Sequence, residues 1–241
     1  MSNDTGNFMK KQILAMGGGG FSMEPDNLKL DRFLLSLSDK PKPKICFIGT
    51  ASGDAEAYID NFYKAMKTLN CTPSHLSLYR GPEGSLRDFV MDKDIFYVGG
   101  GNTRNLLTLW REWHLDQYLY DAYENGTVLA GISAGSICWF DEGVTDSIPG
   151  QLSSLKCLGF LPGSNCPHYD GEVERRSAYH RLQKEGMKSG VACDDGVAAY
   201  YVDGKLNKLV SSRLNANAFS VLLKNDLVHE EAIKPEFLEQ Y

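Results

Sequence analysis

This 241-residue chain is informative first for the patterns that it does not contain. No apolar run approaches the roughly 18 residues that a membrane-spanning helix needs. No basic cluster is present, and the net charge of −6 argues against nucleic acid or an anionic membrane surface as a main partner. Internal repeats, linkers and low-complexity segments are also missing. These absences leave a soluble globular protein whose partner is neither nucleic acid nor membrane.

Metal-binding and disulfide patterns are missing as well. No C-x-x-C pair occurs, so neither a zinc site nor a disulfide framework is indicated. The six cysteines are scattered along the chain: Cys46, Cys71, Cys138, Cys157, Cys166 and Cys193. No signal peptide is visible, because the chain begins with polar residues and no basic residue precedes Lys10. We therefore expect a cytoplasmic protein without a metal ion or a cofactor.

The part of the chain before Phe140 has the pattern of an α/β protein. We expect one domain over residues 1–241, with a flexible leader at 1–10 and a polar C-terminal tail at 224–241. Apolar runs that predict strands alternate with amphipathic stretches that predict helices. The strands are expected at 12–16, 44–48, 74–79, 94–98 and 128–132, and the helices at 27–37, 55–69, 85–91, 104–113 and 115–124. This alternation predicts a doubly wound, largely parallel sheet with helices on both faces.

The pattern is looser after Phe140. Residues 141–150 are polar and turn-rich, and a short strand is expected at 158–162. A strongly charged helix is expected at 172–185. Further strands are expected at 190–193 and 197–202, with a hairpin turn at 203–204 and a last edge strand at 216–223.

Glycine-rich turns follow three of the predicted strands, at 17–20, 99–101 and 131–135. In a doubly wound sheet these turns would meet at the carboxyl edge, which is where binding sites lie. The run Gly17–Gly20 does not have G-x-G-x-x-G spacing, and no helix is expected directly behind it, so a dinucleotide site is not indicated. Glycines there would instead let the backbone approach another group closely.

The turn after the strand at 128–132 has the sequence Gly131-Ile-Ser133-Ala-Gly135, which matches the G-x-S-x-G nucleophile elbow. A side chain on so sharp a turn needs small neighbours. Ser133 would project at the sheet edge, above a helix N-terminus whose free N–H groups can hold an oxyanion. The alternative is an ordinary turn that uses small residues for packing. Ser136, one turn into the helix, is the second-choice nucleophile.

A serine nucleophile needs a base within hydrogen-bond reach and an acid that orients the base. His168 is the candidate base, because it follows an apolar strand in a Pro-His-Tyr loop at the expected level of the elbow. The other histidines fall in a strand, in helices or in a charged segment: His75, His114, His180 and His229. The residues alone leave the acid open among Asp146, Asp194 and Asp195, with Asp141 and Asp170 as weaker candidates.

With these residues in view, the chain resembles the peptidase E family of serine peptidases (aspartyl dipeptidase), which also includes cyanophycinase. Three stretches carry the resemblance: Tyr97-Val-Gly-Gly-Gly-Asn-Thr103, Gly131-Ile-Ser-Ala-Gly-Ser136 and Pro167-His168-Tyr169. The resemblance implies a fold similar to class I glutamine amidotransferases, with serine in place of their cysteine nucleophile. It implies Ser133 as nucleophile, His168 as base, and the backbone N–H groups of Gly101 and Ala134 as oxyanion donors.

The acid is where this sequence departs from peptidase E. That family has an aspartate in a Thr-Asn-Asp-Met-Pro stretch, whereas this chain has Thr145-Asp-Ser147-Ile-Pro149, with Ser147 at the place of the aspartate and Asp146 one place early. Cyanophycinase has its acid, a glutamate, 27 residues after the histidine, and that spacing leads to Asp195 here. The resemblance therefore favours Asp195, with Asp146 second, although an aspartate must reach about one bond further than a glutamate.

The resemblance also implies a serine peptidase that acts on small peptides, with an N-terminal aspartate as one candidate specificity. Peptidase E holds such an aspartate with basic and polar groups, and Asn102, Arg175 and Arg176 are the candidates for this role here. For the two arginines, a solvated helix face is the alternative. Two other functions stay open: a cyanophycinase-like or other amide or ester hydrolase, and a catalytically idle member of the fold that binds a small ligand or a partner.

Overall fold

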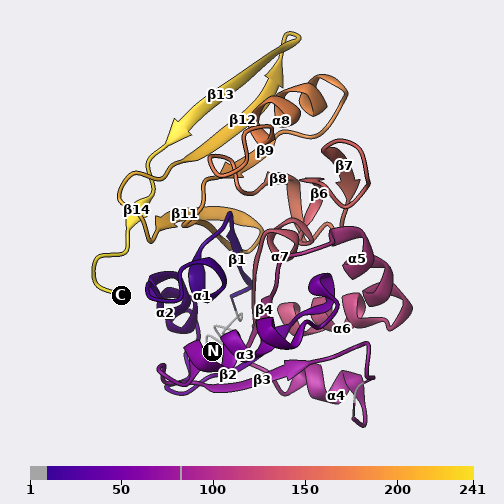
Figure 1. The fold of residues 1–241 in the computed structure, drawn as a ribbon, viewed down its shortest axis with the longest axis vertical. Helices are drawn as coiled ribbons and strands as arrows, with labels where there is room; N and C mark the ends of the chain where they lie inside the picture. The colour runs from indigo at the N-terminus through magenta and orange to yellow at the C-terminus, as the bar shows by residue number, and fades with distance from the viewer. Residues whose placement is uncertain (1–9, 82) are drawn as a thin grey trace, which may run out of the picture.

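Two β-sheets organise the chain (Figure 1). The computed structural model describes residues 10–81 and 83–241, so the leader expected at 1–10 lies, apart from Lys10, outside the described residues. Among the described residues, no helix combines the length and the apolar character that crossing a membrane requires.

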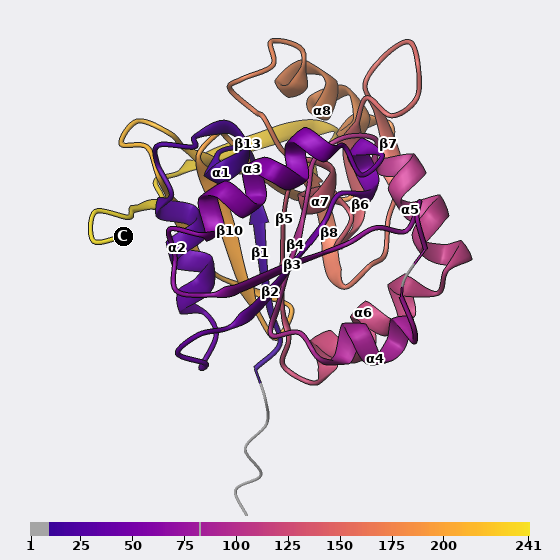
Figure 2. The ribbon, with the colours of Figure 1, turned by 60° about the horizontal axis from the view of Figure 1, so that its bottom comes forward.

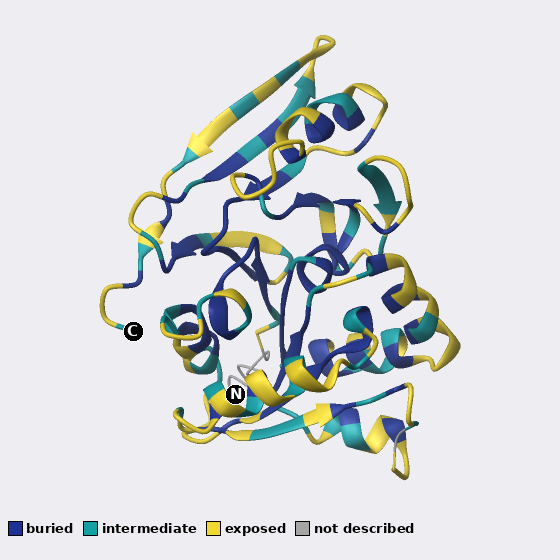
Figure 3. Cartoon of the chain, viewed as in Figure 1, coloured by how far each residue is buried: buried dark blue, intermediate teal, exposed yellow. Residues whose placement is uncertain are grey.

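The larger sheet has eight strands in the order β14-β11-β10-β1-β5-β4-β2-β3. Its strands are β1 (Gln12–Met16), β2 (Lys44–Ile48), β3 (Thr72–Leu76), β4 (Ile95–Val98), β5 (Val128–Ile132), β10 (Val197–Val202), β11 (Lys205–Ser211) and β14 (Glu236–Phe237). The five strands from β1 to β3 in this order are parallel, as predicted, while β10 and β11 extend the sheet in antiparallel fashion. Strands β1, β4 and β5 are almost wholly buried, which is the reason for their mainly apolar sequences (Figure 3).

Helices cover both faces of this sheet. One face packs against α1 (Gly20–Met23), α2 (Lys29–Ser36) and α3 (Glu56–Met66), through side chains such as Phe33 and Phe62. The other packs against α4 (Leu86–Met91), α5 (Thr103–Glu112) and α6 (Leu115–Glu124), through side chains such as Trp110 and Leu119. Figure 2 shows the two groups of helices on opposite sides of the strands. The doubly wound α/β fold with helices on both faces is therefore confirmed.

The smaller sheet has six strands in the order β13-β12-β9-β8-β6-β7. Its strands are β6 (Phe140–Thr145), β7 (Ser153–Lys156), β8 (Leu161–Cys166), β9 (Gly190–Cys193), β12 (Ala218–Lys224) and β13 (Leu227–Ile233). One face packs against α8 (Arg175–Lys184) through a cluster that includes Tyr179 and Phe219. Side chains of the other face, such as Phe140 and Cys193, join the core beneath α5 and α6.

This second sheet corrects several sequence predictions. The stretch 141–150 was expected to be turn-rich but contains most of β6, and β7 was not expected. The strand expected at 158–162 begins only at Leu161. The stretch 216–223 is not an edge strand, because β13 pairs outside β12. The polar tail expected at 224–241 contains β13 and β14. At the other end of the chain, no helix was expected directly after the glycine run, but the short helix α1 begins at Gly20, the last glycine of that run.

Candidate active site

Ser133 lies between β5 and the short helix α7 (Ala134–Ile137), with φ 56° and ψ −115°. A non-glycine residue is strained in this region, and the strain is tolerated only where surrounding contacts fix it. Both glycines of the elbow are in close contact with main chain: a Cβ on Gly131 would lie 2.2 Å from the Gly135 carbonyl oxygen, and a Cβ on Gly135 would lie 2.2 Å from the Val98 carbonyl oxygen. The small residues are thus required by the turn itself and by its packing on β4.

His168 and Asp195 are paired. His168 follows β8 with φ 54°, and its Nδ1 lies 2.6 Å from Asp195 Oδ1. Both side chains are largely buried, at 14% and 11% exposure. A carboxylate that accepts a hydrogen bond from Nδ1–H leaves the lone pair on Nε2, which is the tautomer that a general base needs.

The Asp195 carboxylate occupies a space that only glycines leave open. A Cβ on Gly18 would lie 1.9 Å from Asp195 Oδ1, and a Cβ on Gly171 would lie 2.5 Å from Oδ2. The main-chain N–H of Asp195 donates to Asp170 Oδ1 at 2.7 Å. The neighbouring Asp194 points elsewhere: its carboxylate accepts the Asn217 N–H at 2.8 Å, and burial raises its pKa to about 6.

Asp146 does not share this arrangement. Its side chain is exposed and has no contact with His168 among the hydrogen bonds of the described residues. Ser147, at the place of the peptidase E aspartate, bonds within its own neighbourhood, because its hydroxyl accepts the Thr103 N–H at 2.7 Å and bonds to Thr145 Oγ1 at 2.8 Å. This segment therefore caps the start of α5.

The second-choice nucleophile is enclosed. Ser136 is fully buried, and its hydroxyl donates to Asn165 Oδ1 at 3.1 Å. A substrate cannot reach it without opening the core, so the geometry favours Ser133 over Ser136.

The end of β1 supports all three candidate residues. The N–H of Ser133 donates to the Met16 carbonyl at 3.3 Å, and the N–H of His168 donates to the Gly17 carbonyl at 3.1 Å. Gly196, directly after Asp195, donates to the Gly18 carbonyl at 3.1 Å. The glycine run at 17–20 was expected to let the backbone come close to another group, and that group is other main chain of the same protein.

The third glycine-rich turn follows β4 and touches the elbow. A Cβ on Gly100 would lie 3.3 Å from Ser133 Cβ, so the two turns are in contact. Within this turn, Gly99 N–H donates to the Ile48 carbonyl at 3.0 Å and Asn102 N–H to the Ala51 carbonyl at 2.8 Å.

One main-chain donor in the elbow and one in the turn after β4 stay available. In the part of the chain that the structure describes, no hydrogen bond uses the N–H of Gly101 or of Ala134. These are the two groups that the resemblance implies as oxyanion donors.

The three candidate substrate-binding residues all have contacts within the protein. Asn102 caps α5, with Oδ1 accepting the Asn105 N–H at 2.8 Å. Arg175 is only 3% exposed, and its guanidinium donates to Glu172 at 2.6 Å and to the Val144 carbonyl at 3.1 Å.

Arg176 is also engaged. Its guanidinium donates to Glu230 at 2.6 Å and lies over the rings of Tyr169 and Phe219, which fixes α8 against β13. Glu230 also bonds to His180 at 2.7 Å, so this cluster joins the loop after His168 to the outer strand. The contacts of the two arginines include none with Ser133 or His168.

Sequence reasoning missed two residues around the site. The sequence pattern places Tyr58 on the apolar face of its helix and gives it no other role, yet its hydroxyl accepts the Gly100 N–H at 3.3 Å. Arg213 lies against Gly196 and donates to Glu24 at 2.6 Å. Partial burial alone would lower the pKa of Arg213, but the carboxylates of Glu24, Asp195 and Asp170 raise it. No local pattern marks either residue, because their partners lie far away along the chain.

No group of three or more histidine, cysteine, aspartate or glutamate side chains in the described ranges, 10–81 and 83–241, is arranged to hold a metal ion.

Comparison with known proteins gives a consistent picture. The model of peptidase family S51 matches residues 13–209, a range that includes Ser133, His168 and Asp195. The chain is 56% identical over 229 residues to the uncharacterized peptidase YgaJ of Bacillus subtilis (strain 168), covering 95% of this chain and 99% of that protein.

More distant relatives agree. Peptidase E of Shewanella amazonensis is 27% identical over 164 residues, which cover 64% of this chain and 68% of that protein. The crystal structure of a peptidase from an acI-B1 Actinobacterium has a similar fold, with a TM-score of 0.71 at 18% identity over 94% of this chain and 98% of that chain. From the family match and the 56% identity it follows that the chain belongs to peptidase family S51, a family of serine-type peptidases.

Proposed function

We propose that this chain hydrolyses small peptides through Ser133, His168 and Asp195. The observation that carries the proposal is the 2.6 Å contact between His168 Nδ1 and Asp195, in a loop anchored to the same strand end as the strained Ser133. The arrangement has the parts that serine hydrolysis needs: a nucleophile on a sharp turn, a base, and a buried acid that orients the base.

In the proposed reaction, Ser133 Oγ attacks the carbonyl carbon of the peptide bond while His168 Nε2 takes the hydroxyl proton. Asp195 stabilises the imidazolium that forms. The negative oxygen of the tetrahedral intermediate receives hydrogen bonds from the free N–H groups of Gly101 and Ala134. His168 then protonates the leaving amine as the C–N bond breaks, and a water molecule hydrolyses the resulting acyl-enzyme by the reverse sequence of proton transfers.

Substrate choice is the finer part of the proposal. We favour small peptides, with dipeptides that carry an N-terminal aspartate as one candidate, because one relative is named peptidase E. Arg175 and Arg176 give this specificity no support, since their guanidinium groups are engaged by Glu172 and Glu230. We propose the cytoplasm as the place of action. The alternatives are a cyanophycinase-like or other amide or ester hydrolase, and an idle ligand-binding member of the fold.

A fluorophosphonate probe and a dipeptide panel test the proposal together. Wild type and the Ser136→Ala variant should be labelled by the probe, whereas Ser133→Ala should fold normally and stay unlabelled. In the panel, Asp-Xaa and neutral Xaa-Xaa dipeptides are compared for the same three proteins. Labelling without cleavage of any dipeptide would favour another acyl substrate, and a wild type that is not labelled would favour the ligand-binding alternative.

A further inference from the structure

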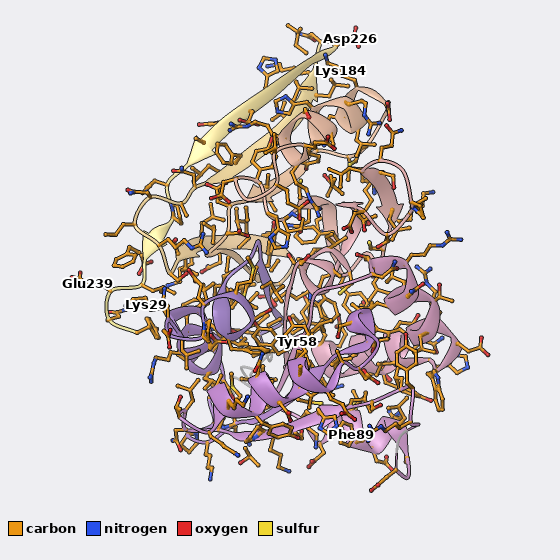
Figure 4. The ribbon with its side chains drawn as sticks, in the orientation of Figure 1. Lys29, Tyr58, Phe89, Lys184, Asp226 and Glu239 are labelled. Atoms are coloured by element: carbon orange, nitrogen blue, oxygen red, sulfur yellow. The ribbon has the colours of Figure 1, made fainter. Side chains whose placement is uncertain are left out.

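Tyr58 connects α3 to the glycine-rich turn beside Ser133 (Figure 4 labels Tyr58). Its hydroxyl oxygen accepts the N–H of Gly100 at 3.3 Å. The ring is held by aromatic neighbours, with centroids 4.9 Å from Phe47 and 5.7 Å from Phe21. A Cβ on Gly99 would lie 2.9 Å from Tyr58 Cε1, so the ring and the turn are in direct contact.

The turn needs external anchors because it consists of glycines. Gly99, Gly100 and Gly101 follow one another, and a run of glycines has more backbone freedom to lose than any other sequence. Gly101 has φ 136°, a conformation that favours glycine. Because glycine has no side chain, the direction of its N–H must be fixed by contacts of the neighbouring backbone. Whether Gly101 N–H points at the oxyanion position depends on how well the preceding peptide group is held.

Three hydrogen bonds from main-chain N–H groups anchor the turn, and one of them goes to a side chain. Gly99 and Asn102 donate to carbonyls of Ile48 and Ala51, which belong to β2 and the 3-10 turn Thr50–Ser52. Gly100 donates to Tyr58. The bond from Gly100 is the nearest anchor before Gly101, and it also occupies an N–H that could otherwise compete for the oxyanion.

We propose that Tyr58 is a positioning residue of the oxyanion site: by accepting the Gly100 N–H, it holds the three-glycine turn so that the free Gly101 N–H faces the carbonyl attacked by Ser133. This inference rests on the proposed function, because it assigns Gly101 its role there. Burial raises the pKa of Tyr58, so the hydroxyl stays neutral at ordinary pH and its oxygen remains an acceptor for an uncharged N–H.

The test compares Tyr58→Phe with Tyr63→Phe. Tyr63 is a matched control on the same helix, because its hydroxyl also hydrogen-bonds to another element, to His75 at 2.9 Å, on an edge strand. Both changes keep the ring and remove one hydroxyl. The readouts are kcat and KM for a cleaved dipeptide, and the affinity of a peptide aldehyde that forms a tetrahedral adduct with the serine.

We expect Tyr58→Phe to lower kcat roughly 10-fold with KM within twofold, since loss of a whole oxyanion donor costs about 100- to 1,000-fold and a misdirected donor costs less. Aldehyde affinity should fall in parallel with kcat, and Tyr63→Phe should change neither. The inference is overturned if kcat of Tyr58→Phe stays within twofold of wild type, if only KM changes, or if Tyr63→Phe shows the same loss.

A second variant protects the test from a folding defect. Difluorotyrosine at position 58, assayed at a pH where its more acidic phenol is still protonated, keeps the ring and the hydroxyl but makes the neutral oxygen a weaker acceptor, so an unchanged kcat relative to wild type at that pH also overturns the inference. Failure of the proposed function gives a different result, because the fluorophosphonate probe then leaves wild-type Ser133 unlabelled and both ideas fall. If Ser133 is labelled and wild type cleaves the dipeptide, only the role of Tyr58 is in question.

Discussion

The buried carboxyl of Asp31 should make the fold less stable as the pH rises. Asp31 lies on α2 with 1% of its surface exposed, and among the described residues neither of its carboxylate oxygens has a hydrogen-bond partner. A Cβ on Gly20 would lie about 3.5 Å from these oxygens and 2.8 Å from the Tyr97 hydroxyl. Burial is the largest cause that raises the pKa of Asp31 from 3.8 to about 7, and nearby main-chain N–H groups offset only part of it.

This shift in pKa has a defined sign and size. The folded chain binds the Asp31 proton more tightly than the unfolded chain does. The contribution of this group to the free energy of unfolding is therefore fully present below pH 4, and it is lost as the pH rises through 7. At about 1.4 kcal/mol for each tenfold difference in proton affinity, the loss reaches about 4 kcal/mol at pH 8 and about 2 kcal/mol at pH 5. Asp31→Asn removes the charge and keeps the shape.

Equilibrium urea unfolding of wild type and Asp31→Asn at pH 5 and pH 8 measures the effect. The advantage of Asp31→Asn in free energy of unfolding should grow by about 2–3 kcal/mol between these two pH values. Asp194, whose pKa is raised to about 6, has an effect of the same sign, but it cancels in the comparison. Asp26→Asn, an exposed acid in the preceding loop, is the control and should show no such growth. A difference that is constant with pH would refute the argument from burial.

Other predictions concern the candidate site itself. Asp195→Asn should lower kcat by roughly 1,000- to 10,000-fold, because His168 loses the group that fixes its tautomer, whereas Asp146→Asn should retain most activity; equal losses in a kinetic assay would contradict the assignment. Gly18→Ala should destabilise the fold by about 1–3 kcal/mol in urea unfolding and abolish cleavage, since its Cβ would lie 1.9 Å from Asp195 Oδ1. Activity should persist in EDTA, and a loss that added zinc restores would contradict the metal-free mechanism.

The parallel half of the fold could be read from local pattern because each element carries its own signal. Strands such as β4 and β5 are buried on both faces, so their sequences are apolar throughout. The elbow and the turn after β4 also carry a local signal, because their glycines lie where one backbone segment packs closely against another. The pairing of His168 with Asp195 was reached through a family spacing, and the structure brings the two side chains together at 2.6 Å.

The second sheet could not be read in the same way. β6 contains glycine and charged residues, while β13 contains charged residues and has no buried position, only exposed and half-buried ones. Their partners also come from distant segments, as when β9 pairs with β12. The same reason applies to Arg176, because Glu230, which binds its guanidinium, lies 54 residues further along the chain.

The three carbonyl groups at the end of β1 have a consequence for how the site opens and closes. Amide hydrogens of Ser133, His168 and Gly196 all donate to the same short piece of backbone, Met16–Gly18, so an opening of this piece would expose all three to exchange with solvent. We therefore expect an opening of this segment to release the candidate nucleophile, base and acid together.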